Sequence, residues 1–498
     1  MFRLLCSFLL GSVAVLGFAP FSWWSIVFFS LAGFLLLILS SFHKNIFLLG
    51  LFYGLGYFGF GVGWIQVSVH QFGIPSYFFS YGVTALLVIF LSIYVGFFAV
   101  LLRLLLNNGF HLAIAGPVLW LAIEYIRGHL FTGFPWLMLG YSQIDGPLSS
   151  YIPIIGSLGC SFLVVLVSCL AVTCVRAERL PSIYCLCALA SVFCLGLLLR
   201  FYETTESRGL PLDVTLVQGA IPQEIKWHPD IRLPSIERYK SISADHWDSD
   251  IIIWPETAIP AFRNEVEEEF EELGSLASKT DTNFLLGIPR ISEESGLKYN
   301  SIVSVGDGEQ VYDKRHLVPF GEYLPAVFRL NWLLDYLDIP MSDFSSGSPS
   351  QALLEFSNYK IGVSICYESI FPALINQTAS ESDFLVNLSN DAWFGDSLGP
   401  HQHLQIARTR ALETGRYLVR ATNNGLTAII NHKGNVLKQA TQFVPTYLRG
   451  PIQLRTGATL YTRLGDRPLM YLAGFLFLFN FFFKSNVRSY RSRSYPYN

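Results

Sequence analysis

Charged side chains are scarce in this chain of 498 residues. They make up 14% of it, whereas soluble domains carry about 25%. The shortage falls on residues 1–199, which hold nine Asp, Glu, Lys and Arg side chains, while residues 200–498 hold 62. Two regions with different solvents are therefore indicated. This balance excludes a single globular core, a disordered chain and a small disulfide-stapled module.

The polar region, residues 200–467, lacks a second cysteine and any run of basic residues. Cys366 is its one cysteine, so no disulfide can form within it. Its 24 basic and 34 acidic residues give it a net negative charge. Because phosphate backbones are bound by clustered cations, nucleic acid is excluded as an expected partner.

Long apolar runs are abundant. A hydrocarbon core about 30 Å thick is crossed by roughly 20 apolar helical residues. On this measure the sequence predicts a membrane α-helical bundle of eight transmembrane helices, near residues 4–19, 23–42, 46–66, 77–106, 111–127, 151–175, 181–199 and 468–483. The first run is similar to a signal peptide, but further spans follow it closely, so we interpret it as a retained helix.

Basic residues orient these spans. If the N-terminus is cytoplasmic, nine Lys and Arg residues lie in inside segments and Arg127 alone lies at an outer end, as the positive-inside rule requires. The predicted organisation is a seven-helix transmembrane region at 1–199, an outer domain at 200–467, and a last transmembrane helix with a basic cytoplasmic tail at 468–498. An outer domain has no ATP, so its expected chemistry is hydrolysis or transfer of an activated group.

Two charges, Glu124 and Arg127, fall near the end of the fifth predicted span. Isolated charges are costly in lipid, so the sequence predicts that the two side chains pair with each other. A structural ion pair and a role in substrate access are both open at this point.

Short β-branched runs alternate with helical patterns in the polar region. The runs begin at Val214, Asp250, Asn283, Asn300, Lys360, Asp383, Leu418 and Thr427, and the helical patterns cover residues 236–247, 266–280 and 401–416. Continuous apolar runs are typical of strands that are buried on both faces. A layered α/β domain is therefore predicted.

Three reactive side chains stand where such runs end. Glu256 follows DIIIWP, Lys314 follows QVYD and Cys366 follows KIGVSI, and catalytic groups favour these positions. The segment after Cys366 is predicted to be helical, so its first N–H groups, together with Lys314, are expected to lower the thiol pKa. Glu256 would accept the thiol proton.

Each of these residues also has a plainer interpretation. Glu256 is explained as a turn cap, Lys314 as a surface cation and Cys366 as a buried core residue. Together, however, they supply the acid, the cation and the thiol that nucleophilic acyl transfer requires.

Four strings extend this pattern: WPET, YDKRHLVPFGEYLP, GVSICYES and NLSNDAWFG. In this order they resemble the nitrilase, or carbon-nitrogen hydrolase, superfamily with its Glu-Lys-Cys triad, whose fold is an α-β-β-α sandwich. The chain also contains EYIRGHLFTGFPWLMLGYSQ, LVQGAIPQEIKW and GPHQHLQIARTRALETGRYLVRATNNG. With these strings and the eight spans, it resembles the apolipoprotein N-acyltransferase family over nearly its full length.

The resemblance implies an enzyme of the bacterial inner membrane with a periplasmic catalytic domain, cytoplasmic termini and a monomeric state. Its acyl donor would be a phospholipid and its acceptor the α-amino group of a diacylglyceryl apolipoprotein, with a thioester between them, no cofactor and no metal. Glu256 would be the general base, Lys314 would stabilise the oxyanion and Cys366 would be the nucleophile. The supporting or substrate-binding residues implied are Glu322, Tyr367, Glu368, Trp393, Trp227 and Asn300.

An apolar groove beside the membrane is expected to hold the acyl chain, because each buried CH₂ contributes about 0.8 kcal/mol. Its candidate lining residues are Phe320, Trp332, Leu333, Leu334 and Tyr336.

Three other functions fit parts of the sequence. A membrane-anchored amidase would share the triad and pass its acyl group to water, but one span would suffice to anchor it. A Cys-His hydrolase would use His316 or His401. A transporter with a regulatory outer domain is disfavoured, because Glu124 and Arg127 are the only acid–base pair within the predicted spans and the sequence has no internal repeat.

Overall fold

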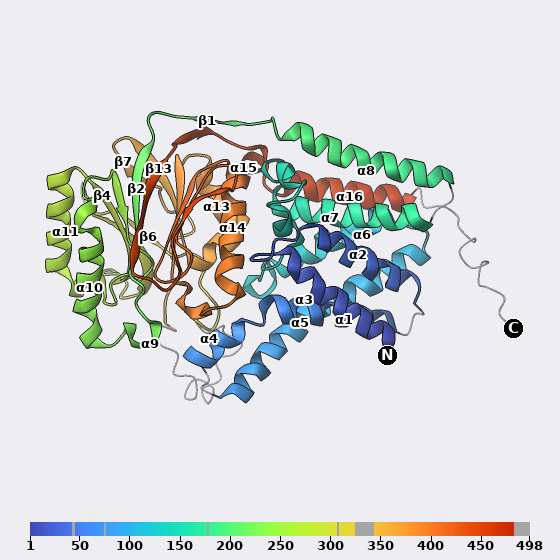
Figure 1. Ribbon diagram of the computed structural model, residues 1–498, viewed down its shortest axis with the longest axis horizontal. Coiled ribbons are helices and arrows are strands. Elements are labelled where there is room, and N and C mark those ends of the chain that lie inside the picture. Colours follow the sequence, from blue (N-terminus) through green and yellow to red (C-terminus); the bar gives the residue numbers. More distant parts are fainter. Residues whose placement is uncertain (42–44, 74–75, 177–178, 306–307, 324–342, 483–498) are drawn as a thin grey trace.

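The computed structural model describes residues 1–41, 45–73, 76–176, 179–305, 308–323 and 343–482. A bundle of apolar helices forms one end of the molecule, and two β-sheets flanked by helices form the other (Figure 1). The chain enters the sheets after residue 199 and returns to the bundle through its last helix, α16 (Arg467–Phe482), which packs on α6 (Leu112–Arg127).

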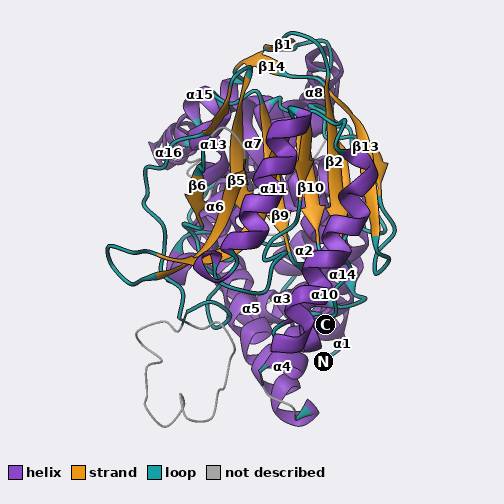
Figure 2. Cartoon of the chain, turned by 90° about the vertical axis from the view of Figure 1, so that its left-hand side faces the viewer, coloured by secondary structure: helices purple, strands orange, loops and turns teal. Residues whose placement is uncertain are grey.

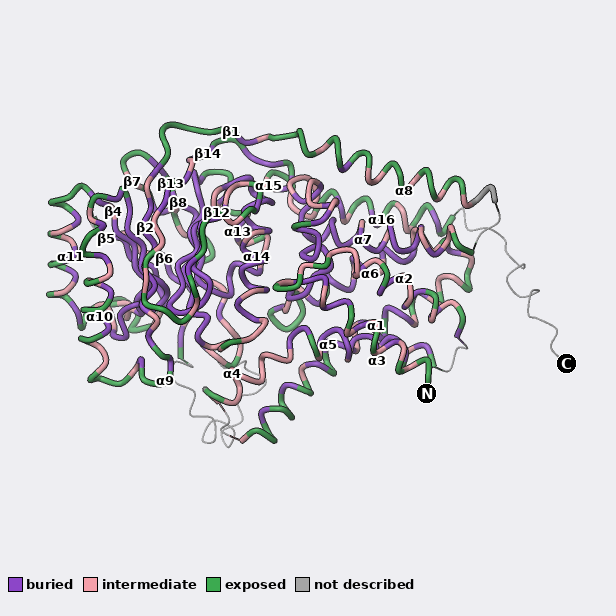
Figure 3. The backbone as a smooth tube through the Cα atoms, in the orientation of Figure 1, coloured by how far each residue is buried: buried purple, intermediate pink, exposed green. Residues whose placement is uncertain are grey.

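The bundle contains an apolar helix in each region where a span is predicted. Besides α6 and α16 these are α1 (Phe2–Ala14), α2 (Ser25–Leu39), α3 (Ile46–Val62), α4 (Ile65–Phe72), α5 (Tyr77–Asn107), α7 (Ile152–Arg176) and α8 (Arg179–Leu199). The expected span at 46–66 is bent by 58° between α3 and α4. Helix α8 lies along the outside of the bundle and is largely exposed (Figure 3).

Fewer helices are long enough to cross a membrane than the sequence predicts. Among the described residues, three helices are long and apolar enough to cross a membrane, Tyr77–Asn107, Ser149–Arg176 and Ser182–Leu199, and the bent α3–α4 pair makes a fourth if it is one span. Helix α6 has 16 residues, which extend about 24 Å at 1.5 Å per residue. The count of eight transmembrane helices is therefore not confirmed.

Glu124 and Arg127 are buried in the bundle, but the predicted direct ion pair between them does not form in the described structure. The Glu124 carboxylate accepts hydrogen bonds from Trp120 Nε1 at 2.9 Å and from the Leu139 backbone N–H at 3.0 Å. Arg127 Nη1 donates to the carbonyl oxygens of Phe134 and Trp136 at 2.7 and 2.5 Å. The Trp120 side chain and nearby backbone groups hold the two charged side chains, so both residues fix the loop that follows α6.

Two six-stranded sheets make up the second part of the molecule. The first has the order β13-β2-β3-β4-β5-β6 and the second β12-β11-β10-β9-β8-β7. Each has three parallel strands at its centre and antiparallel strands outside them. The first sheet contains β2 (Leu212–Gln218), β3 (Ile251–Ile253), β4 (Asn283–Ile291), β5 (Lys298–Val305), β6 (Val311–Asp313) and β13 (Thr446–Ile452). The second contains β7 (Leu354–Phe356), β8 (Tyr359–Ile365), β9 (Phe384–Ser389), β10 (Leu418–Thr422), β11 (Ala428–Ile430) and β12 (Val436–Gln439).

The sheets are stacked face to face between two pairs of helices. Helices α10 (Pro229–Ser243) and α11 (Glu267–Thr280) cover the first sheet, and α13 (Pro372–Ala379) and α14 (Leu398–Thr414) cover the second (Figure 2). One apolar core lies between the sheets and one lies under each helix pair. This is the predicted α-β-β-α sandwich, and all eight predicted strands are present in it.

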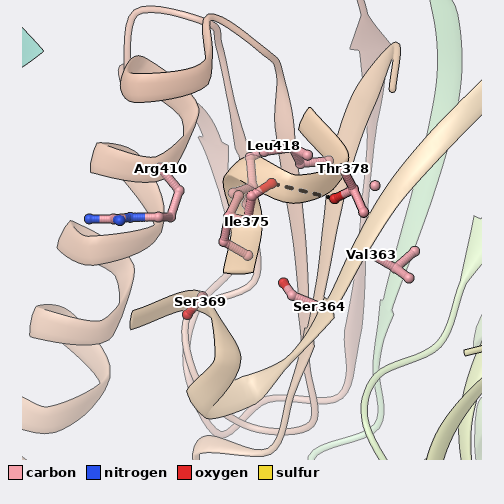
Figure 4. A pocket seen from close by; sticks show the side chains of 9 residues that line it. Val363, Ser364, Ser369, Ile375, Thr378, Arg410 and Leu418 are labelled. Atoms are coloured by element: carbon pink, nitrogen blue, oxygen red, sulfur yellow. Dashed lines mark hydrogen bonds between the residues drawn. The ribbon is translucent and has the colours of Figure 1, made fainter. Parts of the chain in front are cut away.

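Helix α14 joins the sandwich to the bundle, because it packs on β10 on one side and on α7 on the other. Arg410 Nη1 pairs with Glu413 Oε2 at 2.8 Å, and Glu413 Oε1 accepts the Ser157 backbone N–H at 2.7 Å. Arg410 also lines a void between β8 and α13. This void has no room for a water molecule, and the Arg410 guanidinium extends away from it (Figure 4). The two parts are thus held together by a buried polar network.

Candidate active site

The three predicted catalytic residues come from both sheets. Glu256 follows β3, Lys314 follows β6 and Cys366 follows β8. The carboxyl ends of β3, β8 and β9 point to the same side of the stacked sheets, so the residues after these strands meet there.

Lys314 lies between two carboxylates. Its Nζ is 2.8 Å from Glu322 Oε1 and 3.4 Å from Glu256 Oε1, and its side chain is 1% exposed. Burial alone would lower the pKa of this amine, but Glu322 and Glu256 raise the pKa above its usual value. Lys314 is therefore a permanent cation at neutral pH.

Asn300 and Asn390 fix the two carboxylates. Asn300 Nδ2 donates to Glu256 Oε1 at 2.8 Å and to Glu322 Oε1 at 2.9 Å. The other oxygen of Glu256 accepts the backbone N–H of Asn390, which follows β9, at 2.8 Å. Glu256 is thereby held from both sheets, and the structure brings the predicted residues Glu256, Lys314, Glu322 and Asn300 into one cluster.

Cys366 is buried and has an unusual backbone. It has a φ of +49°, in the left-handed region that β-carbon sterics disfavour. It begins a 3₁₀ turn, Cys366–Ile370, and the α-helix starts only at Pro372. The helical segment predicted after Cys366 is present, but it is divided at Phe371 into a 3₁₀ turn and an α-helix, because the residue before a proline is forced out of the helical region.

The expected lowering of the Cys366 pKa is wrong. Burial, followed by the charge of Glu256, raises the pKa of the thiol to about 12, and Lys314 opposes this only in part. The resting thiol is therefore protonated at neutral pH. A nucleophilic sulfur then requires a base at the moment of reaction, and Glu256 is the carboxylate that interacts with it most strongly.

A buried cluster that the sequence did not reveal holds the backbone of Cys366. The Cys366 carbonyl oxygen accepts hydrogen bonds from Ser369 Oγ at 3.0 Å and from His403 Nε2 at 3.1 Å. His403 Nδ1 lies 3.1 Å from Asp391 Oδ1, and Arg420 Nη2 lies 2.8 Å from Asp391 Oδ2. The side chains of Cys366, Asp391 and His403 are grouped closely enough to hold a metal ion. The Arg420 guanidinium, however, already neutralises the Asp391 carboxylate, whose negative charge a metal cation would need.

Glu368 follows Cys366 by two residues, and its buried carboxylate accepts several hydrogen bonds. Its carboxylate accepts the backbone N–H groups of Ile365 and Arg315 at 2.7 Å each, that of His316 at 3.2 Å, and the Tyr312 hydroxyl at 3.0 Å. Burial raises the pKa of this carboxyl, and the backbone donors and Lys314 oppose the shift. Glu368 therefore fixes the segment after Lys314 against the end of β8.

We expect Glu368→Gln to lower the free energy of unfolding by about 1–3 kcal/mol, because the new amide turns N–H groups toward buried donors. Chemical denaturation of the purified protein measures this loss. The exposed Glu381→Gln is the control and should leave stability unchanged. Equal stability of the two variants would contradict the positioning role of Glu368.

Tyr367 and Trp393 link the site to the bundle. The Tyr367 hydroxyl donates to the Gly133 carbonyl at 3.1 Å, and Ser68 Oγ on α4 donates to the Trp393 carbonyl at 2.6 Å. The neighbouring Phe394 ring packs against Trp64, with 4.6 Å between ring centroids. The segment that carries Trp393 thus rests on α4 and on the bend between α3 and α4.

Trp227, Phe320 and the predicted groove residues make up the rest of the predicted site. Trp227 is half-buried at the end of a short helix, α9 (Gln223–Lys226), and its Nε1 has no partner among the described residues. Phe320 is exposed. The other predicted groove residues, Trp332, Leu333, Leu334 and Tyr336, lie outside the described residues, as do the basic residues of the C-terminal tail.

The two histidines of a Cys-His hydrolase are not in contact with Cys366 in the described structure. The His316 ring packs on Phe371 at 3.7 Å between centroids, and burial, followed by Lys314, lowers the pKa of His316 to about 4. His401 lines a cleft of about 520 Å³ between α3, α4 and α14. The histidine nearest to Cys366 is His403, and it hydrogen-bonds the Cys366 backbone.

Gly287 on β4 leaves room for Glu256. A β-carbon there would lie 2.6 Å from Glu256 Cα and 2.6 Å from the Pro255 carbonyl oxygen. We expect Gly287→Ala to displace Glu256, to cost about 1–3 kcal/mol of stability and to slow alkylation of Cys366. Gly274→Ala, where the nearest atom is 3.4 Å away, is the control. Alkylation of Cys366 at the wild-type rate in Gly287→Ala would contradict the expectation that displacing Glu256 slows this reaction.

Comparison with known proteins agrees with both parts of the structure. Residues 10–170 match the family model of the apolipoprotein N-acyltransferase N-terminal domain, and residues 213–460 match that of carbon-nitrogen hydrolase. The second match and the two-sheet sandwich define the class of protein, a carbon-nitrogen hydrolase fold joined to an apolar helical bundle.

Relatives that match nearly the whole chain narrow this class to one family. The apolipoprotein N-acyltransferase of Methylococcus capsulatus is 39% identical, covering 92% of this chain and 92% of its own length. That of Nitrosomonas europaea is also 39% identical, covering 96% of each. The chain belongs to the apolipoprotein N-acyltransferase family. Among solved structures, a CN-hydrolase superfamily protein of Xanthomonas campestris has 18% identity and a TM-score of 0.37, covering 53% of this chain and 97% of its own.

Proposed function

We propose that this protein moves an acyl chain from a phospholipid to the α-amino group of a diacylglyceryl apolipoprotein, through a thioester on Cys366. The observation that carries the proposal is the cluster of Glu256, Lys314 and Glu322 at the strand ends beside Cys366. The relatives' name supplies the substrate class.

The first half-reaction forms the thioester. Glu256 takes the proton from Cys366 Sγ, and the sulfur attacks the ester carbonyl carbon of the phospholipid. Lys314 stabilises the negative charge that develops on the carbonyl oxygen. The ester C–O bond then breaks, Glu256 returns the proton to the departing glycerol oxygen, and a lysophospholipid leaves.

The second half-reaction transfers the acyl chain. The neutral amine of the acceptor attacks the thioester carbonyl carbon, a C–N bond forms and the C–S bond breaks. Glu256 takes a proton from the nitrogen and returns it to the sulfur, which restores the thiol. A thioester conserves most of the free energy of the oxygen ester, so transfer to an amine proceeds without ATP.

Contacts between the site and the bundle support a lipid-borne substrate. Tyr367 and the Trp393 segment both rest on bundle residues, so an acyl chain leaving the bilayer reaches Cys366 over a short path. We accordingly propose that residues 200–467 form an outer, periplasmic domain. It lies between a transmembrane region at 1–199 and a last transmembrane helix with a cytoplasmic tail at 468–498. In this arrangement the enzyme is a multi-pass protein of the bacterial inner membrane and works as a monomer.

Incubation of the full-length protein with a phospholipid and a diacylglyceryl-Cys peptide tests this function. We expect the peptide to gain one acyl chain and lysophospholipid to appear in equal amount, measured by mass spectrometry. The same peptide with an acetylated amine is the control and should gain nothing. Release of free fatty acid without N-acylated peptide would instead identify a hydrolase.

A further inference from the structure

Lys226, the last residue of α9, is a buried amine that the proposed mechanism does not use. Its exposed fraction is 0%, and its one hydrogen-bond partner in the described structure is the Thr257 hydroxyl, at 2.8 Å. An ammonium carries three N–H donors, and desolvating it is costly unless it is paired. A single hydroxyl does not account for its position.

The partner of Lys226 is the residue next to the proposed base. Thr257 has a φ of +47°, a conformation that β-branched residues rarely adopt. In this conformation the Thr257 hydroxyl meets Lys226 while the Glu256 carboxylate meets Lys314. The strained backbone thus links the segment that carries Glu256 to a second buried lysine.

A second contact ties α9 to the same carboxylate. Gln223 Oε1 accepts a hydrogen bond from Asn390 Nδ2 at 2.7 Å, and the Asn390 backbone N–H donates to Glu256 Oε2. Both ends of α9 therefore contact residues that hold Glu256.

The charges around the base show what Lys226 adds. Lys314 is flanked by the carboxylates of Glu256 and Glu322, so this triplet carries a net charge of about −1 when all three are ionised. Within the described structure, Glu256 is the charged group that interacts with Lys226. A protonated Lys226 would bring the cluster to neutrality.

We propose that Lys226 is a positioning residue for the general base, whose ammonium keeps Glu256 ionised until Glu256 takes the thiol proton. The inference rests on the role assigned to Glu256 in the proposed function. Burial lowers the pKa of Lys226 to about 7, and the charge of Glu256 opposes this shift. Lys226 is therefore charged on the acidic side of neutrality and largely neutral above pH 8.

The sign of the pH effect follows. Removing the Lys226 charge destabilises the Glu256 carboxylate, so the acidic limb of the rate profile moves to higher pH. Above pH 8, where Lys226 is already neutral, wild type and variant should converge. A role in packing alone would lower the rate by the same factor at every pH.

The test compares wild type, Lys226→Met and the exposed control Lys360→Met, all full-length in detergent. Iodoacetamide labelling of Cys366, quantified by peptide mass spectrometry from pH 5 to 9, reports the base without any lipid. We expect the acidic limb of Lys226→Met to move up by about one pH unit, which makes labelling about tenfold slower at pH 6. Lys360→Met should follow wild type. A limb that does not move, or a pH-independent loss, would overturn the inference.

A second variant covers the case in which Lys226→Met does not fold. Thr257→Val removes the hydroxyl that holds the ammonium, while Thr257→Ser retains it. We expect the acidic limb to move to higher pH in Thr257→Val and to stay in place in Thr257→Ser. If the two Thr257 variants had the same pH profile, the inference would be overturned. Failure of wild type to form a thioester would refute the proposed function separately, because the labelling profile does not depend on acyl transfer.

Discussion

Replacing Cys366 by Ser is expected to abolish acyl transfer. The hydroxyl is close in size to the thiol, so the buried site and its 3₁₀ turn should keep their structure. A serine oxygen, however, gives up its proton far less readily to Glu256 than a thiol does, and the acyl chain then has no nucleophile to receive it. We expect the rate of peptide N-acylation to fall by about 10⁴-fold or more.

The matched control is Cys187→Ser. Cys187 lies on α8 and is exposed, so this variant should transfer acyl chains at the wild-type rate. Thermal unfolding of both variants checks that the fold is retained. If Cys366→Ser kept a tenth of wild-type activity, Cys366 would not be the nucleophile.

Replacing Lys314 by Met is expected to damage both stability and chemistry. Glu256 and Glu322 would then share a buried site with only Asn300 between them. Removing one partner from a buried ionic cluster typically costs about 3–5 kcal/mol. The oxyanion would lose its cation, and loss of one such group slows reactions about 10²–10³-fold.

The double variant Lys314→Met, Glu322→Gln separates these two effects. Removing the second carboxylate should restore most of the stability measured by denaturation, whereas acyl transfer should stay low. Lys360→Met, on the exposed surface, controls for loss of a lysine. Recovery of full activity in the double variant would show that Lys314 has a structural role alone.

The layered fold could be predicted because its central strands are apolar on both faces. The runs starting at Val214, Asn283 and Leu418 became β2, β4 and β10. The edge strands could not be predicted: β12 is largely exposed, and β13 contains Gly450 and Pro451. Their pairing depends on neighbouring strands rather than on an apolar run.

The membrane part was predictable in position but not in detail. Apolar composition locates each helix, while the bend between α3 and α4 falls at Gly63 and Trp64, within a run that reads as one span. Glu124 and Arg127 were expected to pair because they are three residues apart. They bind backbone groups instead, and these groups belong to a loop whose path the sequence does not reveal.

The candidate active site was predictable to the extent that its residues stand at strand ends. The sequence motifs indicated Glu256, Lys314, Cys366 and Glu322. His403 and Arg420 were missed, because their contacts with Asp391 join α14, β10 and the segment after β9. Lys226 gave no signal either, since a lysine beside Glu and Trp in a polar string is typical of an exposed helix.

The central claim is that the acyl chain passes through Cys366, and one measurement tests it most directly. The full-length protein is mixed with phospholipid without acceptor, and its intact mass and peptides are then recorded. The account predicts one acyl chain per protein, located on Cys366 and removed by hydroxylamine. An acyl chain on another residue, or N-acylated peptide formed by a protein that never carries an adduct, would contradict it.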